Sequence, residues 1–452
     1  MLKKILIVLL LTIPLFFLSW NFKYYSQNYN IADSAVYNQV LNSIIFQGET
    51  GSSLELGGER STFNIHFSPI FLLLAPFKIL WFTDYILEFI QILNFICGLI
   101  ILLIIFKYDN FTTFFWLAGL LMLPQAIGLL FTSFRTVKLC FILISFFYFI
   151  ICYKKNNNKT RFSLILIMIL ILSLIETNYF LGAGVILYLL ILNFDISTIF
   201  KLSIILLLFF AFSLIFLDYS RHREFLNFSS FDFFQALNYF LLIFIVFLGI
   251  FTFDKILIIA LPYILSVCYS NVSNFFNFSN IDFLPTINFY YAVPIITLLL
   301  IALLKKIKTC QMQILNKKIF VLPIIFFFLS ANYGLKEKII FFDFLNNNNA
   351  IEYSKIAKLK EKIPREEKLY VQWLYADLFS DYHNLKFYST TFKNEKKIDG
   401  NIFLDLQLDY LDISDNDAIA FANEINYIKK LIEQNVYKII YIDDRYLILK
   451  SA

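Results

Sequence analysis

The sequence is poor in the residues with which proteins commonly hold metals, bind phosphates or form disulfides. It has 12 glycines, five cysteines and three histidines among 452 residues. The cysteines lie in or beside hydrophobic runs, without a CxxC pair or metal-like spacing, which predicts inert thiols. No glycine-rich phosphate loop, Walker motif or Ser-His-Asp signal is present, so a nucleotide site is not expected. The sequence shows no metal-ligand motif and leaves the need for a divalent metal open.

Charge is also scarce. Only 16% of the residues are charged, whereas 59% are hydrophobic and 56 are phenylalanine. A soluble globular protein does not need so apolar a composition, which indicates a protein that crosses a membrane several times. The net charge of +5 is distributed by side of the membrane and not in one basic patch, so no nucleic-acid partner is expected. Membrane lipid is the expected partner, and the sequence does not indicate an oligomeric state.

Eleven apolar runs predict an α-helical polytopic membrane protein, since a spanning helix takes roughly 20 mostly apolar residues. Lys3 and Lys4 precede the first run, which lacks a cleavage site and is interpreted as an uncleaved anchor with the N-terminus in the cytoplasm. Whether the fifth and sixth runs are two spans or one broken element stays open. The predicted spans are Ile5–Trp20, Ile86–Phe106, Thr112–Phe131, Val137–Tyr153, Phe162–Ile175, Tyr179–Asn193, Leu202–Leu217, Leu237–Phe253, Ile256–Tyr269, Phe289–Leu304 and Ile319–Tyr333.

An odd number of spans places the C-terminus outside the cytoplasmic (inner) membrane. The predicted domains are a polytopic domain, residues 1–334, whose large first outer loop is 21–85, and an extracytoplasmic soluble domain, 335–452. This orientation puts most later Lys and Arg residues in the cytoplasm, as the positive-inside rule requires. The run Pro69–Phe82 is too short to cross and contains Pro76 and Lys78, so it is predicted to lie in the outer interface.

The C-terminal domain has an α/β pattern. A helix with an Asp-rich entry is expected over Ala418–Gln434, between two segments of strand character. This order favours a small sheet packed against helices. Strands are expected at Lys368–Trp373, Lys386–Tyr388, Ile402–Leu406, Tyr437–Ile442 and Tyr446–Leu449.

Two residues of the first outer loop are candidates for chemistry. Asp33 precedes an amphipathic stretch and either caps that helix, since Asp accepts its first amide hydrogens, or acts as a catalytic base toward an acceptor hydroxyl or amine. The two roles are compatible. His66 is either a turn residue before Ser68-Pro69 or a group that binds an anionic substrate or relays a proton.

The remaining candidates for substrate binding are charged residues near the outer side. Arg135, Lys138, Arg221 and Arg223 run against the positive-inside bias. They either snorkel to lipid phosphate or clamp the phosphate of a lipid-linked donor, whose leaving group develops negative charge. Glu176 lies between two short apolar runs and is a functional candidate because a carboxylate is costly in a bilayer, although it can also simply reach the outer surface.

With these residues in place, the chain resembles the bacterial family of predicted membrane proteins called domain of unknown function 2079. That family in turn resembles the polytopic GT-C glycosyltransferases. The chain departs from the family at Asn38, where the family has a second acid, at Arg135, near its His-Pro-Glu segment, and at Thr177, which replaces an acid. The resemblance is carried by Ala32-Asp33 through Gln39, His66-Phe67-Ser68-Pro69, Leu72–Pro76, Ile175-Glu176, Phe289-Tyr290-Tyr291 and Tyr437–Lys450.

The resemblance implies a GT-C-like membrane glycosyltransferase with an essential acid in the first outer loop and an exported α/β tail. Its donor is expected to be a sugar linked to polyprenyl phosphate, used on the outer face of the membrane. This reading is an analogy at the level of the fold. The alternatives are a transporter or flippase of a lipid or glycan, which the lack of internal repeats disfavours, and a non-catalytic protein of envelope assembly.

Overall fold

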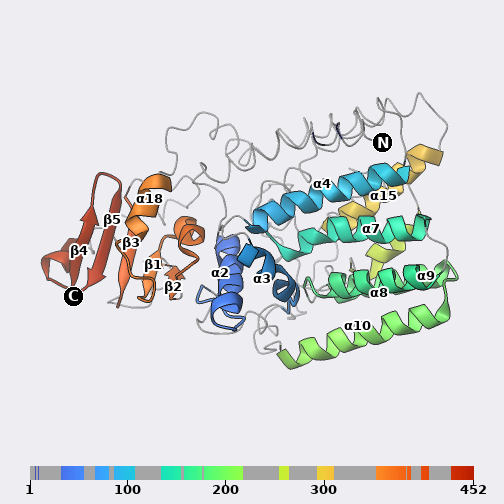
Figure 1. Cartoon of the computed structure of the whole chain (residues 1–452), viewed down its shortest axis with the longest axis horizontal. Coiled ribbons are helices and arrows are strands. Elements are labelled where there is room, and N and C mark those ends of the chain that lie inside the picture. Colours follow the sequence, from blue (N-terminus) through green and yellow to red (C-terminus); the bar gives the residue numbers. More distant parts are fainter. Residues whose placement is uncertain are drawn as a thin grey trace, which may run out of the picture. The chain divides into compact units, whose positions relative to one another are not determined.

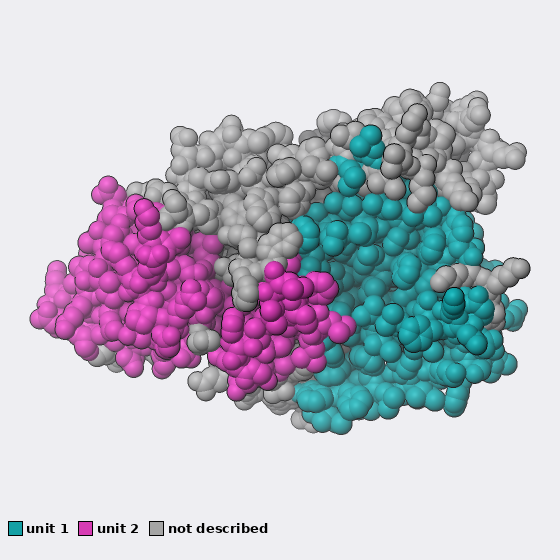
Figure 2. Space-filling model, viewed as in Figure 1, with its two compact units in different colours: residues 1–20, 63–70, 88–339 teal, residues 21–62, 71–87, 340–452 magenta. Residues whose placement is uncertain are grey.

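The computed structural model describes residues 6, 9, 32–54, 67–80, 86–106, 134–153, 157–175, 178–216, 254–263, 293–309, 353–382, 384–387, 399–406 and 429–452. Its contacts divide the chain into two compact units (Figure 2). Unit 1 comprises residues 1–20, 63–70 and 88–339, and unit 2 comprises residues 21–62, 71–87 and 340–452. Unit 2 therefore combines parts of the predicted first outer loop with the C-terminal segment.

Unit 1 is a bundle of apolar helices (Figure 1). Three of the described segments are long and apolar enough to cross a membrane, namely Ile86–Phe106, Thr136–Tyr153 and Ile196–Phe216. The predicted spans Ile5–Trp20, Thr112–Phe131, Leu237–Phe253 and Ile319–Tyr333 lie outside the described residues, apart from residues 6 and 9. The elements are α4 (Ile86–Phe106), η2 (Thr136–Leu139), α7 (Cys140–Tyr153), α8 (Asn158–Leu172), α9 (Asn178–Ile191), α10 (Ile196–Phe216), η5 (Lys255–Ile259) and α15 (Val293–Thr309).

Residues 162–193, which the sequence left open as two spans or one broken element, form two helices. α8 ends at Leu172, and α9 begins at Asn178, whose side-chain amide donates to the carbonyl of Ile171 at 2.9 Å. At the opposite end, Arg161 of α8 pairs with Asp195, which follows α9, at 3.5 Å. The start of α8 thus lies beside the end of α9, and the two helices run antiparallel.

α4 and α7 run parallel. Phe95 stacks on Phe141 with ring centroids 5.3 Å apart, and Phe106 stacks on Tyr148 at 6.1 Å. The contacts therefore advance in the same direction along both helices. If both helices cross a bilayer, the chain between them must return to its first side, which is the role predicted for Thr112–Phe131.

The bundle has two chemically different ends. At the Arg161 end, Lys305 of α15 pairs with Asp254 at 2.6 Å, and Asp254 interacts electrostatically with Tyr188 near the end of α9. At the Lys138 end, the starts of α7 and α9 meet, since the Asn178 amide donates to Cys140 Sγ at 3.4 Å. Cations of the Arg161 end include Lys159, Arg161, Lys201, Lys255 and Lys305.

Unit 2 is built on a mixed five-stranded sheet of order β2-β1-β3-β5-β4. β1 pairs in parallel with β2 and β3, whereas β5 pairs antiparallel with β3 and β4. The small sheet predicted for the C-terminal domain is present, but the first strand is shorter than expected, since the 3-10 helix η7 begins at Trp373. The strands are β1 (Leu369–Val371), β2 (Leu385–Phe387), β3 (Asn401–Asp405), β4 (Tyr437–Ile442) and β5 (Tyr446–Ser451). Of the predicted helix Ala418–Gln434, residues 429–433 are described and are helical.

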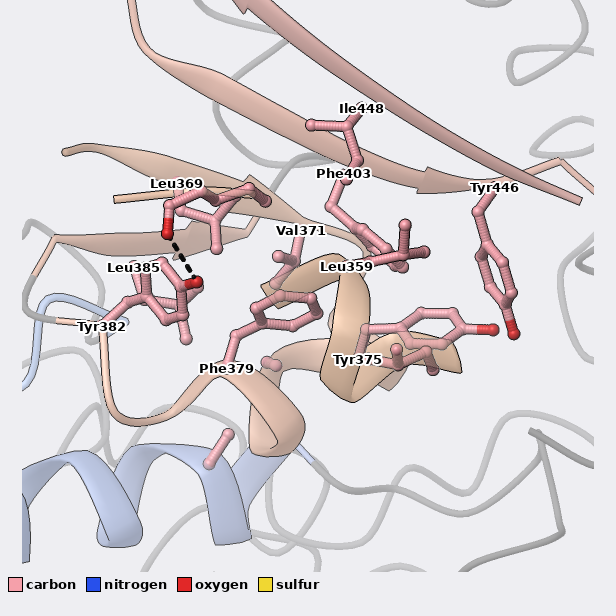
Figure 3. Packing of buried hydrophobic residues seen from close by; sticks show 14 of the residues in the cluster. Leu359, Leu369, Val371, Tyr375, Phe379, Tyr382, Leu385, Phe403, Tyr446 and Ile448 are labelled. Carbon is pink, nitrogen blue, oxygen red and sulfur yellow. Dashed lines mark hydrogen bonds between the residues drawn. The ribbon is translucent and has the colours of Figure 1, made fainter. Parts of the chain in front are cut away.

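Successive side chains of a strand point to opposite faces of the sheet, and a hydrophobic cluster covers each face, so the central strands are buried on both sides. On one face, Phe403 and Tyr446 pack with Tyr375 and Phe379 of η7 and with Leu359 of α18 (Tyr353–Lys360) (Figure 3). The other face buries a second cluster, which contains Tyr370, Ile402, Leu404, Leu431, Tyr437, Leu447 and Leu449.

Helix α2 (Ala32–Phe46) is part of the same fold. Its Ala35 lies in the hydrophobic cluster of the sheet domain, and its buried Gln39 donates to the carbonyl of Tyr382 at 3.0 Å, across 343 residues of sequence. Gln39 also accepts a hydrogen bond from the Ser52 hydroxyl at 2.6 Å. Asn42, one turn further on, donates to the carbonyl of Ser380 at 3.0 Å. The helix that carries Asp33 is therefore positioned by the C-terminal sheet domain.

Candidate functional site

Lys138 is a buried cation at one end of the unit 1 bundle. Its side chain is 1% exposed, and its Nζ donates to Oε1 of Gln91 on α4 at 3.3 Å. The carbonyl of Lys138 accepts from the Asn94 amide at 3.0 Å, while Asn94 Oδ1 accepts from the backbone N–H of Ile142 at 3.1 Å. Asn94 thus ties α4 to the start of α7 and sets the position of Lys138.

One face of α4 supplies the polar partners. Glu88, Gln91 and Asn94 follow one another at intervals of three residues, which places them on the same side of the helix, and all three are buried. Arg135 lies directly before η2 in an extended backbone conformation, at φ −140° and ψ 135°. These four residues and Lys138 are named the Lys138 cluster.

The Lys138 cluster contains two cationic side chains, Arg135 and Lys138, two amides and one carboxyl group, Glu88. A buried ammonium is stable only when hydrogen bonds or an opposite charge compensate its lost hydration. Ionisable groups among membrane helices are rare and commonly mark a substrate pathway. Phosphate accepts a stronger, charge-assisted hydrogen bond from an ammonium than a neutral amide such as that of Gln91 does.

The structure locates three of the seven predicted site residues. Arg135 and Lys138 belong to the Lys138 cluster, whereas Asp33 lies in unit 2 as the second residue of α2, where its position in the helix but not its side chain is described. His66, Glu176, Arg221 and Arg223 lie outside the described residues.

Sequence reasoning missed Gln91 and Asn94. The signal was present, because Glu88, Gln91 and Asn94 interrupt the apolar run Ile86–Phe106 at the spacing of one helical face. Uncharged amides at the end of a predicted span do not indicate a site by themselves, because the sequence does not show the residue that they bind. Lys138 lies 47 residues away from Gln91 in the sequence, and only the packing of η2 against α4 joins them.

A second polar network lies in unit 2, at the carboxyl ends of β1 and β3. Asp405 is fully buried and accepts from the Tyr375 hydroxyl and from Arg445 Nε, the latter at 3.1 Å, while Gln372 Oε1 accepts from the backbone N–H of Asp405 at 2.7 Å. Burial and the neighbouring Asp405 carboxylate raise the pKa of Tyr375, which keeps its hydroxyl a donor. Ligands of open α/β sheets often bind at this edge, but here Tyr375, Gln372 and Arg445 bond to Asp405 inside the core, which is typical of a structural network.

The electrostatics of the turn before β5 reinforce this network. Burial acts to raise the pKa of Asp443, but hydrogen bonds from Lys355, Tyr441 and the backbone N–H groups of Tyr446 and Arg445 outweigh it and hold that pKa below its usual range. The backbone N–H of Arg445 donates to Asp443 Oδ1 at 2.8 Å. These hydrogen bonds hold the turn in the conformation from which Arg445 Nε donates to Asp405.

The described residues contain no group of three or more His, Cys, Asp or Glu side chains that could hold a metal ion. Together, the fold and the Lys138 cluster define a helix bundle with three candidate membrane spans, joined to a mixed-sheet domain. No family model matches the chain, and no curated protein matches it in sequence.

Proposed function

We propose that the chain is a GT-C-like membrane glycosyltransferase that takes its sugar from a polyprenyl-phosphate donor at the outer face of the cytoplasmic membrane. The observation that carries the proposal is the buried Lys138, held by Gln91 and Asn94 at one end of an apolar bundle. A cation in this setting favours an anionic ligand, and the phosphate of a lipid-linked donor is an anion that is delivered by the bilayer.

The proposed reaction assigns a role to each candidate. Asp33 accepts the proton of the acceptor hydroxyl as the new bond to the sugar forms. The bond between the sugar and the phosphate breaks, and the phosphate leaves with the electron pair. Arg135 and Lys138 stabilise the negative charge that develops on it. His66, Glu176, Arg221 and Arg223 keep the substrate-binding roles expected from the sequence.

The proposed topology places the Arg161 end in the cytoplasm and unit 2 outside. The collection of Lys and Arg at the Arg161 end supports this orientation. A second argument comes from unit 2, because α2 and the C-terminal strands share one hydrophobic cluster and must fold on the same side of a membrane. The chain between residues 87 and 340 must then cross an even number of times, which the ten spans predicted in that interval satisfy.

Reporter fusions test this topology. A reporter inserted after Gly48, in the loop that follows α2, and another fused after Ala452 are both expected to be active only outside the cytoplasm. The measurement is the activity of alkaline phosphatase and of a cytoplasm-specific fluorescent protein at each site, with a fusion after Asn156 as the cytoplasmic control. Reporters that lie on opposite sides, or a C-terminal fusion active only in the cytoplasm, would refute the proposed orientation.

The donor site is tested by replacing Lys138 with Met. The change keeps the length of the side chain and removes a charge-assisted hydrogen bond, so the apparent KM for the lipid-linked donor is expected to rise roughly tenfold to hundredfold. Transfer is measured in proteoliposomes with a panel of polyprenyl-phosphate sugars. Lys201→Met, at the exposed start of α10 and the opposite end of the bundle, is the matched control and should leave the KM unchanged.

Two outcomes would contradict the proposal. Failure of the wild-type protein to transfer sugar from any donor of the panel would leave the transferase assignment without support and favour a transporter. An unchanged KM in Lys138→Met, at normal membrane levels, would remove the Lys138 cluster from the donor site.

A further inference from the structure

Helix α3 (Ile70–Leu80) buries its charged side chain and exposes apolar ones, whereas a helix on a water-facing surface does the reverse. Its only charged residue, Lys78, points inward, is 4% exposed and donates to Asn38 Oδ1 on α2 at 3.2 Å. The outward side is apolar and consists of Leu72, Leu73, Pro76, Phe77, Ile79 and Leu80. The exposed fractions of Phe77 and Leu80 are 53% and 84%, values that are costly for large apolar side chains in water.

We propose that this outward side of α3, named the α3 apolar face, lies on the surface of the lipid bilayer. The described part of α3 is too short to cross, since its 11 helical residues extend about 16 Å and the hydrocarbon core is roughly 30 Å thick. The position of α3 in the chain places it next to a bilayer, because the candidate span Ile86–Phe106 begins six residues after Leu80. The six Cα–Cα steps from Leu80 to Ile86 reach at most about 22 Å, which keeps the end of α3 close to the point where α4 enters the membrane.

The start of α3 is anchored as well. The backbone N–H of Ile70 donates to the carbonyl of Ser173 at 3.0 Å, at the end of α8. Ser173 lies at the Lys138 end of the unit 1 bundle, where α8 ends and α9 begins. Because Ile70 lies beside the end of α8 and Leu80 precedes a candidate span by six residues, lipid is the occupant favoured for the α3 apolar face.

The contacts between α3 and α2 connect the docking of α3 with the position of Asp33. The consequence for Asp33 rests on the proposed function. Tyr37 of α2 stacks on Phe71 of α3 with ring centroids 5.1 Å apart, one residue before the buried contact between Asn38 and Lys78. Asp33 lies five residues before Asn38, or about 7.5 Å along the helix axis. An interfacial helix sits at the boundary between headgroups and acyl chains. The two contacts thus keep Asp33 near the level of lipid phosphates, where the donor phosphate is found.

Fluorescence quenching in nanodiscs that contain one protein copy tests the docking. The full chain, with its five cysteines replaced by Ala, carries a single Phe77→Cys change labelled with NBD, and the lipids carry doxyl groups at carbon 5 or carbon 12. The label is expected to be quenched at least about twofold more than the same label at Ile442→Cys, an exposed apolar site on β4, and more by carbon 5 than by carbon 12. A single copy in each disc removes a second protein molecule as the occupant.

Every other pattern overturns the inference. Equal quenching at positions 77 and 442 would mean that the α3 apolar face does not contact lipid, and stronger quenching by carbon 12 would mean that α3 inserts more deeply than a surface helix. Leu73→Cys lies one turn earlier on the same face and repeats the measurement if Phe77→Cys fails to fold. Since quenching is measured without turnover, its outcome is independent of whether the chain transfers sugar.

Discussion

Asp33→Asn is expected to abolish turnover while the protein still folds and inserts normally. Asp33 is the second residue of α2, within its first turn, where replacement by Asn removes only a favourable charge–dipole interaction of about 0.3 to 1 kcal/mol. The amide cannot accept a proton, however. A general base typically contributes about a hundredfold to ten-thousandfold in rate, and a loss of that size in sugar transfer is the expected result.

The measurement compares transfer by Asp33→Asn, Asp33→Ala and the wild type in proteoliposomes, at equal amounts of inserted protein. Asp33→Ala removes both the base and the helix-terminal acceptor, so it should lose activity and some stability together. If Asp33→Asn transfers sugar at the wild-type rate while Asp33→Ala accumulates poorly, Asp33 is a capping residue and the proposed mechanism loses its base.

Arg445→Met is expected to destabilise unit 2 by about 3 to 5 kcal/mol, because removing one partner of a buried ion pair leaves the other charge uncompensated. Asp405 is fully buried and accepts from Arg445 Nε at 3.1 Å. β3, which carries Asp405, is the central strand of the sheet, and β5 follows Arg445 directly. The cost should therefore appear across the sheet and not only at its edge.

Hydrogen exchange of the β3 and β5 amides in the full-length protein measures this free energy. Adding Asp405→Asn to Arg445→Met should restore most of the protection, since the neutral amide still accepts from the Tyr375 hydroxyl and no buried charge remains. Lys438→Met, at an exposed position of β4, is the control and should stay within about 0.5 kcal/mol of the wild type. A loss of less than about 1 kcal/mol in Arg445→Met would show that Asp405 is compensated by other groups.

The elements that depend on local pattern were predictable from the sequence. The apolar run Ile86–Phe106 forms a helix with the predicted bounds, and Tyr437–Ile442 forms a strand with the predicted bounds. Helix and strand periodicity and continuous apolarity are properties of neighbouring residues, so they can be recognised without a partner. Where the local signal was weaker, the bounds shifted, as at Trp373, which begins η7 instead of ending β1.

The candidate site depends on contacts that no local pattern contains. Arg135 and Lys138 were predicted from their unusual charge, but the link of Lys138 to α4 required the packing of segments 47 residues apart. The attachment of α2 to the sheet domain required a contact across 343 residues. The residue pattern of the run Pro69–Phe82 indicated a segment in the outer interface, yet only the tertiary structure decided that Lys78 points at Asn38 and leaves the apolar side outward. A side chain's neighbours across the fold depend on how helices pack and not on the residues beside it, which is why composition and periodicity determined the elements and tertiary packing determined the site.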